Sequence, residues 1–226
     1  LILSPKPGAP KGSVDARQAY AQGDYAQAAD LMPKVFKVER NALRSLARGD
    51  APNRAIKAID PTAAGFFISS FQSAIFNAVL NERVRSGTLD TLEPGDLAFV
   101  LKSRANFQVT AEELESGDET LQDRLNRFEI SPSGPMWGTT MARAGGEVDE
   151  RELGALAQAD VSPKDMELCE QRDGLPMIGG DRRPLRIPVI DPEVEGGIDE
   201  HGSYIRCAFE LPRGSFATTV MDEVMK

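Results

Sequence analysis

The sequence has few of the residues from which metal and thiol sites are built. It contains one histidine, His201, and two cysteines, Cys169 and Cys207, which form no close-spaced pair. A zinc site usually needs four His or Cys ligands, and a Cys-His nucleophilic pair needs both residue types together. We therefore expect no metal site and no Cys-His nucleophilic pair. The scarcity of cysteine also fits a reducing cytoplasm, where we expect the protein to act.

Long uncharged runs are scarce as well. The opening apolar run is short and is interrupted by Pro5 and Pro7, so it does not resemble a secretory signal. One segment, residues 63–80, carries no charge and reaches the minimum length for suspicion of a membrane span. It contains several polar residues, among them Ser69, Gln72 and Asn77. We therefore expect a buried helix of a soluble protein and no membrane contact.

Positive charge is in the minority. The chain has 26 Lys and Arg against 35 Asp and Glu, which gives a net charge of −9. This balance argues mildly against nucleic acid as a partner, because phosphate binding usually needs a basic face. A local basic cluster can still coexist with an acidic remainder. Two such clusters are present: Arg182, Arg183 and Arg186 near one end, and Lys34, Lys37, Arg40, Arg44 and Arg48 at helical spacing.

The 226 residues, 41% of them hydrophobic, suffice for one large domain or two small ones. Their pattern predicts an α+β fold that is mostly helical and has short strands. Thr110 with Glu113 predicts a capped helix start. The expected helices are residues 14–32 (two helices broken at Gly23-Asp24), 38–47, 63–86, 111–127, 147–159 and a short one after 216. The expected strands are 97–101, 107–109, 186–190 and 203–211, and residues 131–138 are expected to be irregular because of their prolines and glycines.

Three blocks of sequence, in this order, resemble the TruD family of tRNA pseudouridine synthases. The first is Ser-Phe-Gln-Ser-Ala-Ile-Phe-Asn at residues 70–77, followed by Arg83 and Gly95-Asp96. The second is Ser-Gly-Pro-Met-Trp-Gly at 133–138, followed by Glu152 and by Gly-Asp-Arg-Arg-Pro-Leu at 180–185. The third is Phe-Glu-Leu-Pro-Arg-Gly-Ser-Phe-Ala-Thr at 209–218. They are spread over residues 70–218.

The resemblance implies an isomerase that converts a uridine of tRNA, of the D-arm position 13 type, into pseudouridine. It implies that residues 1–187 form the family's insertion domain. Residues 188–226 then return to complete a mixed catalytic β-sheet. The opening of the chain is more similar to the archaeal and eukaryotic branch than to the shorter bacterial form. No cofactor is implied, the partner is tRNA, and we expect a monomer.

The resemblance also assigns site residues. It makes Phe216, with its neighbour Ser215, part of the wall that packs against the target base; the alternative is a core residue that covers a strand end. Arg182 and Arg183 are candidates for phosphate contact, or for pairing with an acidic neighbour. No catalytic residue is assigned, because the family's catalytic aspartate is expected upstream of this sequence. Asp96 and Asp191 look like turn residues.

Two other functions stay open on the sequence. The chain can be a non-catalytic RNA-binding module that lacks the catalytic half. It can also be a helical protein–protein adaptor, because residues 19–29 resemble half of a tetratricopeptide unit. No second copy of that unit is present, and a solenoid needs several repeats to bury its faces.

Overall fold

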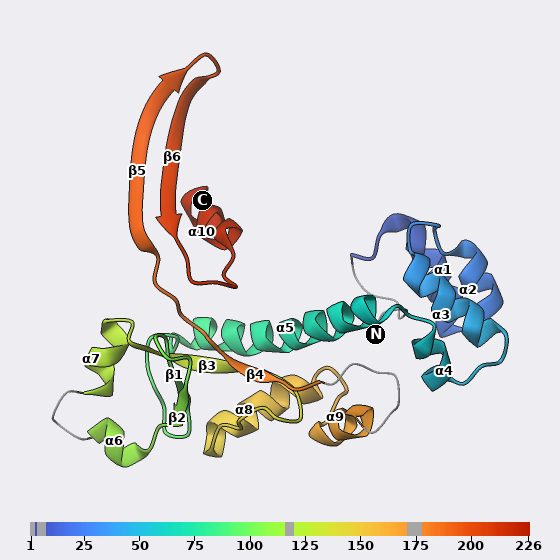
Figure 1. The fold of residues 1–226 in the computed structure, drawn as a ribbon, viewed down its shortest axis with the longest axis horizontal. Coiled ribbons are helices and arrows are strands. Elements are labelled where there is room, and N and C mark those ends of the chain that lie inside the picture. Colours follow the sequence, from blue (N-terminus) through green and yellow to red (C-terminus); the bar gives the residue numbers. More distant parts are fainter. Residues whose placement is uncertain (1–2, 4–7, 116–119, 171–177) are drawn as a thin grey trace. The chain divides into compact units, whose positions relative to one another are not determined.

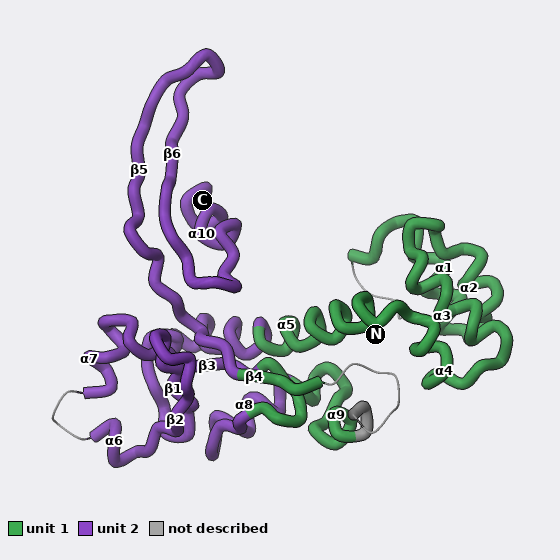
Figure 2. The backbone as a smooth tube through the Cα atoms, in the orientation of Figure 1, with its two compact units in different colours: residues 1–76, 136–141, 156–181 green, residues 77–135, 142–155, 182–226 purple. Residues whose placement is uncertain are grey.

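The structure, a computed structural model, describes residue 3 and residues 8–115, 120–170 and 178–226, with the backbone alone for 168–170. Most of the opening connector and the side chain of Cys169 therefore lie outside the described residues. The fold is α+β, as predicted. Figure 2 shows two compact units: residues 1–76, 136–141 and 156–181 form unit 1, and residues 77–135, 142–155 and 182–226 form unit 2.

Unit 1 begins with a group of short helices. They are η1 (Lys11–Ser13), α1 (Val14–Ala21), α2 (Tyr25–Leu31), α3 (Lys37–Ala47) and α4 (Pro52–Lys57). The predicted break falls at Gly23, whose φ is +81°, and the Asp24 side chain caps α2 by accepting from the Gln27 amide at 2.9 Å. Ala16, Ala28, Met32 and Leu43 are members of the core of this group. Of these helices, η1 and α4 were not predicted.

The long helix α5 (Pro61–Ser86) is present as predicted (Figure 1). It is long and apolar enough to cross a membrane, with a mean hydropathy of 1.4 over its most apolar 18 residues. Only 22% of that window is buried, so this chain alone does not bury the helix as the sequence led us to expect. Phe66, for example, is 70% exposed. The end of α5 in unit 1 includes Ile75 and Phe76, which are buried.

A four-stranded sheet, in the order β2-β1-β3-β4, forms the centre of unit 2. Its strands are β1 (Leu97–Val100), β2 (Asn106–Gln108), β3 (Ile130–Met136) and β4 (Asp181–Pro184). β1 pairs antiparallel with both β2 and β3. Two short helices, α6 (Ala111–Glu115) and α7 (Leu121–Asn126), follow β2. The predicted cap of α6 is confirmed, because Thr110 and Glu113 exchange hydrogen bonds in both directions.

Two sequence predictions about strands are wrong. Residues 130–136 form an inner strand, although they include Pro132 and Pro135. A proline lacks only the amide donor, and the Pro132 carbonyl still accepts from the Leu185 amide at 2.8 Å. Residues 186–189 are not a strand. Instead, the Arg186 amide donates to Ser131 Oγ at 3.0 Å, and the Arg186 guanidinium lies 4.7 Å from the centroid of the Phe128 ring.

The remaining elements are two helices, α8 (Gly146–Ala157) and α9 (Pro163–Glu170), and the C-terminal β5 (Ile190–Asp199), β6 (Gly202–Glu210) and α10 (Ala217–Val224). Strands β5 and β6 form a long antiparallel hairpin (Figure 1). β6 and α10 were predicted; β5 and α9 were not. The register of β5 shifts between Ile190 and Glu193, where Asp191 has a positive φ of 45°. This bulge accommodates Pro192 within the strand.

The close approach of Gly95 and Gly145 provides a stability test within unit 2. The Gly145 amide donates to the Gly95 carbonyl at 2.8 Å, and a Cβ on Gly95, whose φ is +96°, would lie 2.3 Å from the Gly145 carbonyl oxygen. We expect Gly95→Ala in the full-length protein to lower the free energy of unfolding by about 2–4 kcal/mol in urea titration. The control is Gly146→Ala, which also has positive φ but would meet no atom within 4 Å. It is expected to cost about 1 kcal/mol. Equal losses in both variants would contradict the packing argument.

Candidate active site

The turn between β6 and α10 presents the aromatic residue that the sequence singled out. The Ser215 amide donates to the Pro212 carbonyl at 3.1 Å, and Gly214 takes a φ of +91° to close the turn. Phe216 follows with extended backbone at the N-cap of α10. Its side chain is 69% exposed. Within the described residues Phe216 is therefore not a core residue covering the end of the strand, and its ring is accessible.

The two arginines of β4 differ in environment, because successive side chains of a strand point to opposite faces. Arg182 is 1% exposed and forms two 2.7 Å hydrogen bonds to the Glu152 carboxylate. It also donates to Ser133, to Oγ at 3.1 Å and to the carbonyl oxygen at 2.7 Å. The prediction that Arg182 contacts tRNA is wrong for this conformation, since its guanidinium is enclosed. The alternative, pairing with an acidic neighbour, is what the structure has.

Arg183 lies on the other side of β4 and meets the candidate turn. Its Nη2 donates to the Gly214 carbonyl at 2.8 Å. That carbonyl lies two residues before Phe216. Arg183 thus links the sheet of unit 2 to the turn that presents the aromatic ring. Of the four residues predicted from the sequence, Arg183, Ser215 and Phe216 meet at the turn between β6 and α10. Arg182 lies on the opposite, buried side of β4 and holds that strand through Glu152.

Glu152 is the partner to which the sequence analysis gave no role. Burial raises the pKa of its carboxyl, and the hydrogen bonds and charge of Arg182 oppose that rise. The bidentate geometry satisfies both carboxylate oxygens. The one sequence signal for this contact was that Ser133, Glu152 and Arg182 belong to the same block. Ser133 lies 19 residues before Glu152, and Glu152 lies 30 residues before Arg182, so no local pattern connects them.

A second buried charge cluster joins the end of α5 to the turn before β1. Arg83 binds Asp96, which is fully buried, and lies 3.6 Å from Glu93. Arg151 of α8 binds Glu93 from the other side. Arg83 also donates to the Thr88 carbonyl at 3.2 Å, beyond the end of α5. Asp96 is thus paired with Arg83, so this carboxylate is not available to act as a base.

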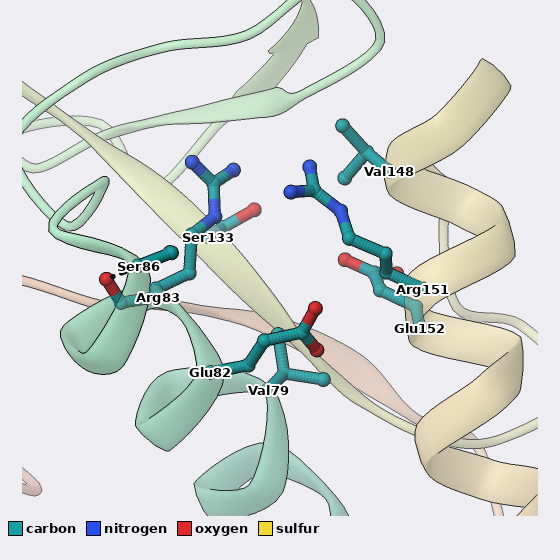
Figure 3. Close-up of a pocket in the computed structure, with 8 residues that line it drawn as sticks. All are labelled: Val79, Glu82, Arg83, Ser86, Ser133, Val148, Arg151 and Glu152. Carbon is teal, nitrogen blue, oxygen red and sulfur yellow. Dashed lines mark hydrogen bonds between the residues drawn. The ribbon is translucent and has the colours of Figure 1, made fainter.

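The space beside these charges is too small for a nucleobase. Figure 3 shows it between α5 and α8, lined by Val79, Glu82, Arg83, Ser86, Ser133, Val148, Arg151 and Glu152. Its enclosed part is about the size of one water molecule.

Among the described residues no group of three or more His, Cys, Asp or Glu side chains is placed to hold a metal ion. We therefore find no carboxylate here that meets a base-sized pocket.

In unit 1, two further contacts join the blocks that carried the resemblance. Gln72 Nε2 of α5 donates to the Trp137 carbonyl at 2.7 Å. Gly138 and Gly180 lie so close that a Cβ on Gly138 would be 2.3 Å from the Gly180 amide nitrogen. Residues far apart in sequence therefore meet each other directly. The first and second blocks are thus in direct contact within unit 1.

Comparison with known proteins identifies the family. A model of the family described as tRNA pseudouridine synthase D (TruD) matches residues 1–224. The chain belongs to the TruD family. Proteins named tRNA pseudouridine synthase D from Geobacter sulfurreducens and Geobacter sp. strain M21 are 39% and 37% identical to it, each match covering 93% of this chain. The matches cover 48% and 49% of those two proteins, so this TruD chain spans about half the length of these curated relatives.

A solved TruD structure supports the fold. The crystal structure of a protein named tRNA pseudouridine synthase D from Methanosarcina mazei matches all of this chain and 53% of its own, with a TM-score of 0.75 and 25% identity. The bacterial relatives are thus more similar to this chain than the archaeal structure is. The similarity of the opening residues to the archaeal and eukaryotic branch stays a prediction.

Removal of the buried arginine tests its structural role. We expect Arg182→Met in the full-length protein to lower the free energy of unfolding by about 3–5 kcal/mol, because Glu152 is left buried and unpaired. The measurement is urea unfolding followed by circular dichroism. Arg206→Met is the matched control: Arg206 pairs with Glu195 at 2.8 Å, but both side chains are more than half exposed. The control should change stability little. If both variants lowered the free energy of unfolding equally, the buried Arg182–Glu152 contact would contribute no more than an exposed ion pair.

Proposed function

We propose that the full-length protein is a tRNA pseudouridine synthase that converts a uridine of the D-arm, of the position 13 type, into pseudouridine. The support is membership of the TruD family together with an exposed aromatic ring at Phe216 on a braced turn. The reaction breaks the C1′–N1 bond of the uridine, rotates the base and joins C1′ to C5. The hydrogen on C5 is then released as a proton, and N1 takes up a proton. No metal or organic cofactor is needed for these steps.

The catalytic carboxylate belongs to the remaining half of the protein in this proposal. Two observations support it. The TruD relatives are about twice as long as this chain, and the two buried carboxylates among the described residues, Glu152 and Asp96, are held by arginines. A carboxylate is required to start cleavage of the glycosidic bond, as nucleophile or as base. The described residues then contribute to the wall of the base pocket.

Residues 188–226 are proposed to complete the catalytic sheet, with residues 1–187 as the insertion domain. The β5–β6 hairpin is amphipathic: Val194 pairs with Cys207 and Gly196 with Ile205, and Val194, Ile198 and Ile205 are exposed on this face. Two strands alone are marginal in water. We propose that the remaining half of the protein covers this face.

The same half is proposed to cover the exposed apolar side of α5, so that the enzyme is a cytoplasmic monomer without membrane contact. Gln72 supports protein rather than lipid as the environment, because its side chain is hydrogen-bonded to the Trp137 backbone. Ser69, Ser70 and Ser73 add polar groups in the middle of the helix. A membrane span would have to place these groups in hydrocarbon.

Tritium release tests the proposed activity. The substrate is tRNA transcribed with uridine that carries tritium at C5, and the enzyme is the full-length protein, with residues 1–226 measured beside it. We expect release with the full-length protein and none with residues 1–226, because the carboxylate is proposed to lie outside them. Absence of release from the full-length protein on a complete tRNA pool would favour a non-catalytic RNA-binding module. Absence of tRNA binding as well would favour an adaptor.

Phe216→Ala tests the pocket wall. Stacking of an aromatic ring on a base is worth about 1–3 kcal/mol, so kcat/KM for tRNA should fall roughly 5- to 150-fold while the fold is retained. Phe216→Tyr keeps the ring and should retain most of the activity. Unchanged kcat/KM in Phe216→Ala would remove this residue from the pocket.

A further inference from the structure

Positive charge is concentrated in one short part of unit 1. Between residues 33 and 57 there are seven basic side chains and two acidic ones, a local net charge of +5 in a chain whose total is −9. The rest of the chain therefore carries −14. An acidic remainder repels a polyanion, so contact with one must occur at patches of the opposite sign. Residues 33–57 are such a patch, and nothing in the proposed base pocket uses them.

The basic residues lie on one face of α3. Lys37, Arg40, Arg44 and Arg48 follow one another at spacings of three, four and four residues, which confines them to about 80° of the helix circumference. The buried residues of the helix, Ala42, Leu43 and Ser45, lie on the remaining circumference. We call Lys37, Arg40, Arg44 and Arg48 the α3 basic face. From its first to its last member the helix rises about 16 Å, enough to meet several phosphates of one strand.

Helix stability does not explain this face. Cations near the C-terminal end of a helix are favoured by the helix dipole, which accounts for Arg44 and Arg48. Lys37, however, is the first residue of α3, where the dipole disfavours a cation. Lys34, one turn earlier, adds another positive charge outside the helix. The positive charge at the N-terminal end of the face thus lowers the stability of the helix, so helix stability does not account for its presence.

Most of the charge is not neutralised by the protein. Asp50 lies 3.4 Å from Arg48 and 3.5 Å from Arg54. A hydrogen bond from Ser45 and these two guanidinium groups lower the pKa of its carboxyl, so Asp50 stays ionised. In the described part of the chain, no carboxylate oxygen lies within 4 Å of the charged groups of Lys34, Lys37 or Arg44. Lys34, Lys37 and Arg44 are also exposed.

We propose that the α3 basic face, with Lys34, binds the phosphate backbone of the tRNA substrate. The proposal rests on the proposed function, because tRNA is the polyanion that the enzyme handles. Contacts of Lys and Arg with phosphates fix position and carry no sequence information. The α3 basic face therefore orients tRNA on the enzyme without reading bases. It acts in binding and takes no part in the isomerisation.

The test is the salt dependence of tRNA binding by the full-length protein. Lys37→Gln/Arg44→Gln is compared with Lys102→Gln/Lys164→Gln, which removes the same charge from exposed positions outside the face. Each lost phosphate contact lowers the slope of log K against log salt by about 0.7–0.9. We expect the first variant to lose about 1.4–1.8 from the slope and to bind tRNA roughly 25- to 60-fold more weakly at 0.1 M salt. The control variant should keep the parent's slope.

Two further measurements separate this proposal from its alternatives. Lys37→Arg/Arg44→Lys keeps the charge and should keep the slope, which excludes a loss caused by misfolding. Tritium release at saturating tRNA should be unchanged in all three variants, because the face is outside the chemistry. Equal slopes for parent and Lys37→Gln/Arg44→Gln would overturn the proposal even if the enzyme is active. A reduced slope without any tritium release would support the face and contradict the proposed activity instead.

Discussion

The buried contact between Arg182, Glu152 and Ser133 is the interaction on which the rest of unit 2 depends. Removing two charges from water costs several kcal/mol per ion, and only complete hydrogen bonding offsets that cost. Arg182 satisfies both oxygens of Glu152, and the Ser133 hydroxyl donates a hydrogen bond to the Leu97 carbonyl at 2.5 Å. The contact thereby joins β1, β3, β4 and α8. Because Arg182 is fixed inside, Arg183 is fixed outside and reaches the turn before Phe216.

Much of the fold could be predicted from local chemistry. The glycine break between α1 and α2, the capping box of α6 and the alternating pattern of β6 each depend on residues close in sequence. The inner strand β3 could not be predicted, because Pro132 and Pro135 are typical of a break in regular structure. The strand forms only through tertiary pairing with β1 and β4. The bulge at Asp191 hid β5 in the same way.

The candidate site was predictable only through resemblance. Phe216 in isolation looks like any aromatic residue after a strand, and its exposure emerges only from the structure. The roles of Arg182 and Arg183 depend on strand alternation and on distant partners, which a pair of adjacent arginines does not reveal. The same holds for Asp96, which resembles a turn residue but is fully buried against Arg83. Of the four candidate binding residues, Arg182 is thus enclosed and paired with Glu152 in the described residues.

The central claim is that the family blocks in this chain build a scaffold that positions the base pocket and do not perform the chemistry. The most direct test is turnover of the double variant Arg182→Met/Glu152→Leu in the full-length protein, measured at saturating tRNA below its unfolding temperature. Replacing a buried ion pair by apolar residues of similar volume is often neutral for stability. We predict a folded variant whose kcat stays close to that of the parent, because the apolar pair fills the same space and keeps β4, and with it Arg183 and the turn before Phe216, in place. A folded, stable double variant without turnover would contradict the account, because Arg182 or Glu152 would then act in the reaction itself.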